Sequence, residues 1–322
     1  MFRDARIVLC ALLAASLPGC QPEEVAPVPA PVVDSPVTLA EERSHAAADP
    51  IVAWVEQLKG RSRLDDRGRL ILVDLSDTAV TNDDLARLAD QPYLRSLRFT
   101  RCQVDDAGVQ QLTDLPRLVS LGLDFTNVTD VGLQHVAQLD TLEEVLLASA
   151  PVGDTGAAAL AGLPNLRQLR LAGTHITDAA LEQLAAAPAL QNLDVSDTGV
   201  TDAGLVHVAN MPQLTRLNLY TTPVSNSGVE TLQPLADQLV WLNLDNTGVT
   251  DAGLPALEPF QNLEFLHLGR TAITDEGVGS LAKLNSLQTL HVTRTGVSEA
   301  GAEQLLAALP DCELHWGDPD QP

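Results

Sequence analysis

The chain has 322 residues, a formal net charge of −24 and an aromatic content of 3%. This length usually indicates two globular domains, but a repeat protein grows by stacking and can accommodate it in one. The excess of acid argues against nucleic-acid binding, because chains with that function carry a basic stripe that contacts phosphates.

Residues 1–19 have the pattern of a signal peptide. Arg3 and Arg6 precede a largely apolar run over residues 7–17, which is too short to cross a bilayer. The run ends in Leu-Pro-Gly-Cys, which resembles a bacterial lipobox whose cysteine, here Cys20, receives a diacylglyceryl group. An ordinary cleaved signal with an incidental cysteine is the alternative. We expect a lipoprotein anchored outside the cytoplasm, in the periplasm or at the cell surface.

Residues 20–49 are expected to form a linker behind the lipidated cysteine. Residues 21–50 contain six prolines and six acidic residues, a composition that cannot bury a core. Two further cysteines, Cys102 and Cys312, lie at opposite ends of the remaining chain. Their separation far exceeds the reach of a disulfide, so we expect no intramolecular bridge.

Residues 50–69 are expected to cap the structured region at its N-terminal end. Ile51, Val52, Val55 and Leu58 recur at helical spacing. The segment Asp-Asp-Arg-Gly over residues 65–68 is typical of a hairpin turn that leads into the first repeated strand. A cap is needed because the first unit of a repeat array otherwise exposes its apolar face.

A 24-residue pattern then repeats over residues 70–310. Its ten copies begin at Leu70, Leu94, Leu118, Leu142, Leu166, Leu190, Leu214, Leu239, Leu263 and Leu287, and only the seventh has 25 residues. Such self-similarity indicates a solenoid, in which each unit buries its apolar face against its neighbours.

Each repeat contains a strand followed by a helix. The segment Leu-x-x-Leu-x-Leu alternates in the way of a strand with one buried face, and the segment after Thr-Asp-x-Gly-Leu has helical spacing. A threonine before the aspartate can cap the helix in several repeats, at Thr129, Thr177, Thr201, Thr250 and Thr274. Strands and helices therefore alternate on opposite sides of a coil.

These residues resemble the bacterial leucine-rich repeats of the 24-residue class, related to ribonuclease-inhibitor-like and F-box-adaptor repeats. The resemblance implies an α/β fold, a right-handed horseshoe solenoid with a parallel sheet on the concave face and helices on the convex face, used for protein recognition. A threonine replaces the asparagine of many such repeats in the turn slot, at Thr78, Thr126, Thr174, Thr198, Thr222, Thr247, Thr271 and Thr295. Cys102 and Ala150 depart from it, which predicts a locally incomplete ladder. Residues 311–322 are expected to form a cap strand and tail, with Leu314 and Trp316 facing inward.

One aspartate recurs at the start of most helices, at Asp106, Asp130, Asp154, Asp178, Asp202, Asp251 and Asp275. A row of carboxylates could bind Ca²⁺. Each carboxylate also lies beside its own helix N-terminus, where negative charge is stabilising. We favour helix-end stabilisation, because Asn82, Asn226 and Glu299 fill the same slot in other repeats.

The third, fifth, seventh and eighth positions of each repeat are expected to point outward from the concave strands. They carry the acidic residues Asp74, Asp77, Asp124, Glu144, Asp194, Asp197 and Asp245 and the basic residues Arg98, Arg101, Arg170, Arg216, Arg270 and Arg294. This face is therefore nearly neutral, and the excess acid lies elsewhere, where it serves solubility.

Exposed aromatic residues are expected on the C-terminal half of this face, at Tyr220, Trp241 and Phe265. Arg216, Arg270 and Arg294 lie nearby, with His267 and His291, and Trp, Tyr and Arg are the commonest interface hot spots. We predict that these eight residues bind the partner. The alternative is that the aromatic residues pack only on one another.

His267, His291 and His315 occupy the same position in three successive strands. Imidazoles so placed could share Zn²⁺ or Cu²⁺, but no carboxylate or thiolate clearly completes the shell, so we favour a polar ladder. A weak enzyme hypothesis would combine this ladder with Asp245. The chain has no nucleophile elbow, P-loop, dinucleotide-binding or zinc-protease motif.

The sequence thus predicts a non-enzymatic, monomeric, lipid-anchored scaffold that binds a partner protein on its concave face. No cofactor, metal or nucleic acid is expected. The alternative is a module that binds a glycan or the cell wall, since Asn218, Asn243 and Asp245 beside aromatic residues also suit sugars. A metal-dependent enzyme is the less favoured third class.

Overall fold

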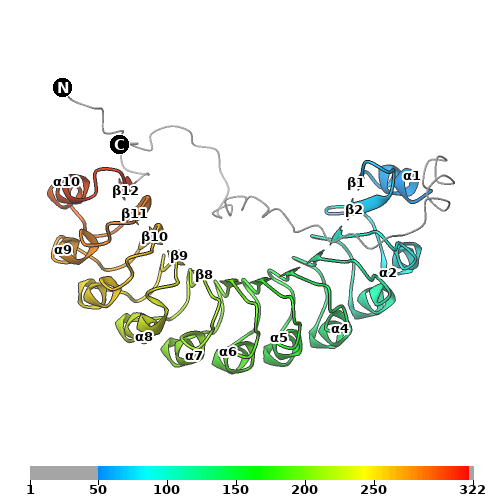
Figure 1. Ribbon diagram of the computed structural model, residues 1–322, viewed down its shortest axis with the longest axis horizontal. Coiled ribbons are helices and arrows are strands. Elements are labelled where there is room, and N and C mark those ends of the chain that lie inside the picture. The colour runs from blue at the N-terminus through cyan, green and yellow to red at the C-terminus, as the bar shows by residue number, and fades with distance from the viewer. Residues whose placement is uncertain (1–49, 319–322) are drawn as a thin grey trace.

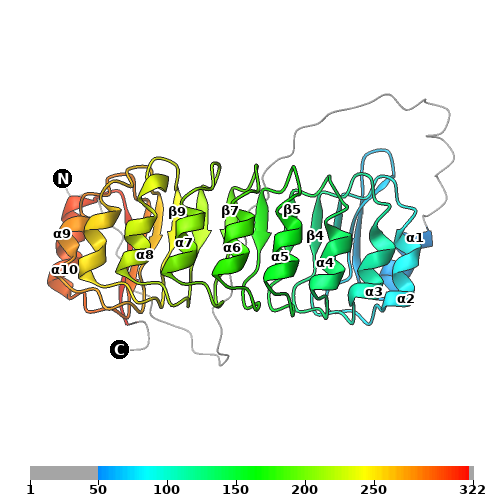
Figure 2. The same ribbon diagram turned by 90° about the horizontal axis from the view of Figure 1, so that it is seen from below.

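The computed structural model describes residues 50–318. The predicted signal peptide, Cys20 and the linker lie outside the described residues. The chain forms an arc of stacked coils, with strands along the inner side and helices along the outer side (Figure 1). The helices stand side by side across the convex face when the arc is seen from below (Figure 2). The α/β solenoid predicted from the sequence is confirmed.

One twelve-stranded sheet runs through the described residues, and its strands follow the order of the chain from β1 to β12. β1 pairs with β2 antiparallel, and each later neighbouring pair, from β2–β3 to β11–β12, is parallel. The strands are β1 (Arg61–Leu64), β2 (Leu70–Asp74), β3 (Ser96–Arg98), β4 (Ser120–Gly122), β5 (Glu144–Leu146), β6 (Gln168–Arg170), β7 (Asn192–Asp194), β8 (Arg216–Asn218), β9 (Trp241–Asn243), β10 (Phe265–His267), β11 (Thr289–Thr293) and β12 (Glu313–Gly317).

The outer side carries short helices. The α-helices are α1 (Pro50–Gln57), α2 (Asn82–Leu85), α3 (Asp106–Val109), α4 (Asp130–Val136), α5 (Asp154–Leu160), α6 (Asp178–Leu184), α7 (Asp202–Val208), α8 (Asn226–Thr231), α9 (Val278–Leu281) and α10 (Glu299–Ala308). The 3₁₀ helices are η1 (Ala86–Leu88), η2 (Gln110–Leu112), η3 (Gln233–Leu235) and η4 (Asp251–Leu257). Pro255 lies inside η4, where its missing N–H cannot make an α-helical hydrogen bond.

The apolar positions of each repeat form one continuous core between sheet and helices. In the third repeat Leu118, Leu121 and Leu123 are fully buried, and Leu133 and Val136 reach the same core from α4. Each coil contacts the coils before and after it, so burial is shared between neighbours.

A left-handed residue occupies the eighth position of each repeat, in the turn that follows the strand. The residues are Asp77, Arg101, Phe125, Ser149, Gly173, Asp197, Thr221, Asn246, Arg270 and Arg294, with φ between 53° and 66°. Only one of them is glycine, so the other turns carry the steric cost of this conformation. In return, the backbone N–H of Phe125 donates to the Ala148 carbonyl of the next repeat, at 2.7 Å.

The turn-slot threonines act within their own repeats. The Thr126 hydroxyl donates to the Leu123 carbonyl at 2.7 Å, and the Thr174 hydroxyl donates to the Leu171 carbonyl at 2.6 Å. The row of threonines is therefore not a chain of side-chain hydrogen bonds between repeats. The threonine instead satisfies a carbonyl that the turn leaves without a strand partner.

The two ends of the array differ. At the N-terminal end Val55 and Trp54 of α1 are buried, and β1 and β2 form a hairpin around Gly68, where φ is 76°. Trp54 was not among the residues singled out from the sequence. At the C-terminal end Leu314 of β12 is buried and Trp316 packs, partly buried, against the core. Within residues 50–318, no helix has the length and apolar character needed to cross a membrane.

Candidate functional site

Two adjacent rows of side chains follow strands β8 to β12 on the concave face. Trp241 is aligned with Arg216 on one side and with Phe265 on the other. His291 is aligned with His267 on one side and with His315 on the other. Since neighbouring strands lie ~4.8 Å apart, side chains in one row are close enough to touch.

The first row contains a stack of aromatic and guanidinium groups. Trp241 and Phe265 stack face to face, with ring centroids 4.8 Å apart and an interplanar angle of 6°. The Arg216 guanidinium lies 4.8 Å from the Trp241 ring centroid, and the ring centroids of Phe265 and His291 are 5.4 Å apart. All four side chains are half-buried. The aromatic residues lie at the predicted outward positions but are only partly exposed, because they also pack on one another and each ring covers part of its neighbour.

The second row is a stack of imidazoles. The ring centroids of His267 and His291 are 4.6 Å apart, and those of His291 and His315 are 4.1 Å apart with nearly parallel planes. Burial lowers the pKa of His291 to about 3, with a smaller contribution from the two neighbouring imidazoles. Burial also lowers the pKa of His267. His291 is therefore neutral at pH 7, and across the described residues no group of three or more His, Cys, Asp or Glu is placed to hold a metal ion.

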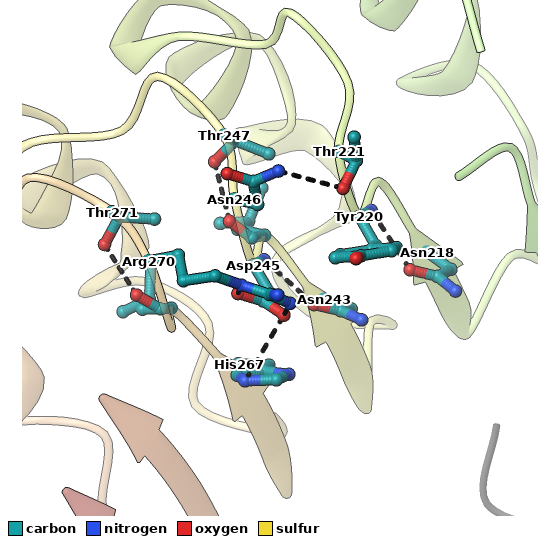
Figure 3. Close-up of polar contacts among 12 residues, drawn as sticks. Asn218, Tyr220, Thr221, Asn243, Asp245, Asn246, Thr247, His267, Arg270 and Thr271 are labelled. Atoms are coloured by element: carbon teal, nitrogen blue, oxygen red, sulfur yellow. Dashed lines mark hydrogen bonds and ion pairs between the residues drawn. The ribbon is translucent and has the colours of Figure 1, made fainter. Parts of the chain in front are cut away.

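A polar network adjoins these rows at the ends of β8, β9 and β10 (Figure 3). The Arg270 guanidinium donates two hydrogen bonds to the Asp245 carboxylate, one of them from Nε to Oδ1 at 3.0 Å. The same guanidinium lies 5.1 Å from the Tyr220 ring centroid. His267 Nε2 lies 3.7 Å from Asp245 Oδ2, and the backbone N–H of Asp245 donates to Asn243 Oδ1 at 2.9 Å. The network fixes Tyr220 and Arg270 beside the aromatic stack.

The two aspartates at the seventh position of the repeat do not face solvent as expected, although Tyr220 at the same position is only half-buried. Asp124 is only 6% exposed and Asp245 only 3% exposed. Burial raises the pKa of Asp124, and the backbone N–H of Ala148 donates to it at 2.6 Å. These carboxylates therefore position neighbouring groups and do not offer free negative charge to a partner.

Gly269 is the sequence signal that could have revealed the burial of Asp245. A Cβ at this glycine would lie 2.8 Å from His267 Nε2 and 3.0 Å from Asp245 Oδ1. Because Gly269 has no Cβ, it leaves room for the side chain of Asp245 from the preceding repeat.

Arg294 is the predicted site residue that lies apart from the stack. It is exposed at the eighth position, and its Nε lies 3.3 Å from Asp318 Oδ1. The structure thus brings together Tyr220, Trp241, Phe265, Arg216, Arg270, His267 and His291, and pairs Arg294 with Asp318 outside this group. His315 joins the imidazole stack, in line with the ladder of three histidines predicted from the sequence, although it was not among the predicted binding residues.

The aspartate row on the convex side links successive repeats. Asp178 Oδ1 accepts a hydrogen bond from the backbone N–H of Thr201 at 2.7 Å, and its Oδ2 accepts one from the Thr201 hydroxyl at 2.7 Å. The Thr201 hydroxyl in turn accepts from the backbone N–H of Ala203 and caps α7. Six of the seven carboxylates bond the N-cap residue of the following helix, and Asp251 bonds Thr274, which precedes the N-cap of α9, a role that the sequence pattern alone had not suggested.

The exceptions in this row follow the same chemistry. Asn82 faces Asp105 at the next N-cap, and its amide nitrogen donates to the Asp105 carboxylate at 2.6 Å. An aspartate in place of Asn82 would put two carboxylates in contact. Asn226 bonds Thr250 in the same arrangement.

Comparisons with known proteins address the fold. The family model described as leucine-rich repeat matches residues 90–112, 162–185 and 261–282. The comparison with curated protein sequences finds no match.

Among solved structures, one similar to this chain is the leucine-rich-repeat ectodomain of the Arabidopsis receptor kinase HAESA, in complex with an N-terminally extended IDA peptide hormone. The TM-score is 0.55 and the sequence identity is 15%, and the match covers 80% of this chain and 44% of that one. A TDR receptor has a TM-score of 0.50 and 14% identity, covering 77% of this chain and 42% of that one. An internalin, inlF, from Listeria monocytogenes has a TM-score of 0.45 and 16% identity, covering 82% of this chain and 92% of that one.

The chain spans less than half the length of the two receptors. The family match and these two structures agree with the strand-and-helix coils of residues 50–318. The chain therefore contains leucine-rich repeats and folds as an α/β leucine-rich-repeat solenoid.

Proposed function

We propose that this protein is a non-enzymatic, monomeric scaffold, held outside the cytoplasm by a lipid on Cys20, that binds a partner protein on its concave face. The observation that carries the proposal is the C-terminal patch, defined as Arg216, Tyr220, Trp241, Phe265, Arg270, His267 and His291. Aromatic and arginine side chains held in fixed positions lose little conformational freedom on binding, which favours affinity.

The solved HAESA ectodomain is in complex with a peptide hormone. We extend protein or peptide recognition to this chain because its own concave patch has the composition of an interface centre. The patch spans β8 to β11, a preformed curved surface on which contacts can be distributed over several strands.

The glycan alternative is weakened by the packing of Trp241. Arg216 on β8 lies over the Trp241 ring and Phe265 on β10 stacks against it, from the two strands that flank β9. A sugar stacks on an aromatic side chain through a free ring face. Here Arg216 and Phe265 lie against the Trp241 ring, where a sugar would have to stack. We therefore retain the protein partner as the proposed ligand.

Site-specific photo-cross-linking in intact cells tests the proposal. A benzophenone amino acid replaces Thr289, which is aligned with Phe265 at the patch border, and a matched probe replaces Gln168 at the equivalent position of β6. We expect one dominant protein adduct from position 289, lost on Trp241→Glu, and none from position 168. Equal adducts at both positions, or an adduct indifferent to Trp241→Glu in a folded protein, would contradict the proposal.

The anchor is tested separately. Cys20→Ser should move the protein from the membrane fraction to the soluble fraction and abolish incorporation of labelled palmitate, while the adduct at position 289 is still formed by the folded solenoid. A wild-type protein that incorporates no label would rule out lipidation.

A further inference from the structure

The arginines at outward concave positions differ in whether a carboxylate of the same chain compensates them. Arg101 pairs with Asp77, Arg270 with Asp245, Arg294 with Asp318, and Arg170 lies 3.6 Å from Asp194. Arg98 lies near Asp124, where its charge opposes the rise in the pKa of that carboxyl. Four of the six arginines thus lie within 4.0 Å of a carboxylate, and the exposed Arg98, which forms no such ion pair, is still near enough to Asp124 to affect the pKa of that carboxyl.

Arg216 is the exception. Among residues 50–318, no carboxylate forms an ion pair with it, and its contact on the sheet is with the face of Trp241. Desolvation alone lowers the pKa of its guanidinium, with no opposing contribution from a nearby acid. A half-buried guanidinium without a counterion is costly, and a chain of net charge −24 has many acids with which to pair it.

Charge on this face is also uneven. At the outward positions, repeats one to six carry three arginines and six acidic residues, whereas repeats seven to ten carry three arginines and one acidic residue. That one acid, Asp245, is buried and held by Arg270. The C-terminal patch is therefore a basic and aromatic region on an otherwise acidic molecule.

From this arrangement, and resting on the proposed function, we propose that the patch binds an acidic linear segment of the partner protein, with an Asp or Glu carboxylate paired to Arg216 and an apolar side chain packed against Phe265 and His291. Arginine suits this role because its planar guanidinium can hold a carboxylate through two hydrogen bonds while its face remains stacked on a ring.

The register sets the spacing of the two contacts. Arg216 and Phe265 lie two strands apart, a separation of ~10 Å, which an extended peptide crossing the strands covers in about three residues. The segment is therefore expected to contain an acidic residue and, two to four residues away, an aromatic or large aliphatic residue.

Selection from a phage library of random dodecapeptides on the immobilised full-length protein tests this specificity. Wild-type protein should enrich Asp or Glu with an aromatic or aliphatic residue two to four positions away, and R216Q should lose the acidic preference. Enrichment of basic or uncharged peptides, or of none above a bare-surface control, would overturn the inference. The cross-link at position 289 reports separately on the proposed function, because it does not require a linear or acidic ligand.

A double-mutant cycle then tests the pairing directly. One selected peptide is synthesised with its Glu and with Gln in its place, and both are titrated by fluorescence anisotropy. R216Q should weaken binding of the Glu peptide at least tenfold and of the Gln peptide less than twofold, and R98Q should change neither by more than twofold. Because the Gln peptide tests the pair without altering the protein, equal affinity of the two peptides for the wild type would overturn the inference even if R216Q failed to fold.

Discussion

Stacked imidazoles at His267, His291 and His315 are compatible with the fold only while they carry little charge. Their rings are 4.6 Å and 4.1 Å apart, and protonation of more than one would place cations in contact on a half-buried surface. Asp245 Oδ2 lies 3.7 Å from His267 Nε2, and Glu313 Oε1 lies 3.3 Å from His315 Nε2. Within residues 50–318 no carboxylate forms such a contact with the central ring, His291. At the scale of the residue, His291 is therefore the position most sensitive to acid.

Acidification should destabilise the protein through His291. Its pKa is about 3 in the folded chain, against an ordinary value of 6.5, so between these two pH values the unfolded chain binds a proton that the folded chain does not. The free energy of unfolding should therefore fall as pH drops from 6.5 toward 3, and this contribution should be constant above pH 7. Between pH 7.5 and 5, urea unfolding should show wild type losing on the order of 1 kcal/mol more than His291→Gln. Since both proteins share every carboxylate and every other histidine, parallel pH profiles would refute this assignment.

The left-handed turn at Ser149 is a second site where one residue sets local stability. Its φ is 56°, and Gly173 occupies the equivalent slot of the next repeat with φ of 66°. Ser149→Gly should relieve the steric cost and raise the free energy of unfolding by about 0.5–1 kcal/mol relative to Ser149→Ala, which retains a Cβ. Chemical denaturation of the two variants measures this difference, and a glycine variant no more stable than the alanine variant would show that the turn is unstrained.

At the scale of the element, successive helices are held in register by one side chain per repeat, a carboxylate in most repeats and an amide at Asn82 and Asn226. The helices are short, and α6 and α7 have seven residues each, so neither would be stable alone. The Asp178 carboxylate joins the first turn of α6 to the N-cap of α7 through two hydrogen bonds. The pattern of aspartates on the convex side is therefore an inter-repeat connection.

Removing and replacing this carboxylate should have different effects. Asp178→Ala leaves the Thr201 N–H without its protein acceptor and should lower the free energy of unfolding by about 1–3 kcal/mol. Asp178→Asn should cost less, about 0.5 kcal/mol, because Asn226 also accepts from the backbone N–H of Thr250, while its amide nitrogen donates to the Thr250 hydroxyl in the reverse direction to the Thr201–Asp178 bond. Equal losses in the two variants, measured by urea unfolding, would mean that the charge at the helix end matters and the hydrogen bonds do not.

The sequence predicts the coil well and its polar connections poorly, for a physical reason. Strand and helix positions recur in every copy, so periodicity identifies the apolar face and the outward rows that hold Trp241 and Phe265. A carboxylate before a helix has the same appearance in sequence whether it stabilises its own helix or, as at Asp178, bonds the next one. The burial of Asp245 depends on Arg270, His267 and the missing Cβ of Gly269, which lie one repeat away.

At the scale of the whole molecule, the repeats that stabilise the middle of the solenoid are not the repeats that carry the C-terminal patch. Each repeat contacts mainly the repeats beside it, so the central coils act as interchangeable units. The C-terminal patch draws on β8 to β11 and the end of the sheet, and it makes no direct contact with the fourth repeat, residues 142–165. The fourth repeat also departs from the pattern, with Gly153 at the helix N-cap, where Asp130 finds the backbone N–H but no hydroxyl.

Deleting residues 142–165 should therefore give a folded, shorter solenoid. The deletion joins the third repeat to the fifth in register and places Thr177 where Gly153 had been, so Asp130 gains a hydroxyl partner of the kind that Asp154 now has. It also removes the contacts of Glu144 with Ser120 and of Glu143 with Arg167. We expect the midpoint of thermal unfolding, measured by circular dichroism, to fall by no more than about 5 °C. The adduct at position 289 should also be retained.

A matched deletion of residues 142–153 removes half a repeat and sets strand positions against helix positions of the neighbouring coil. This variant should fail to fold, because apolar residues of one coil would face the polar positions of the next. If the half-repeat deletion folded as well as the whole-repeat deletion, register between coils would not determine the stability of the array. If the whole-repeat deletion folded but lost the adduct, recognition would extend beyond the C-terminal patch into the N-terminal half of the concave face.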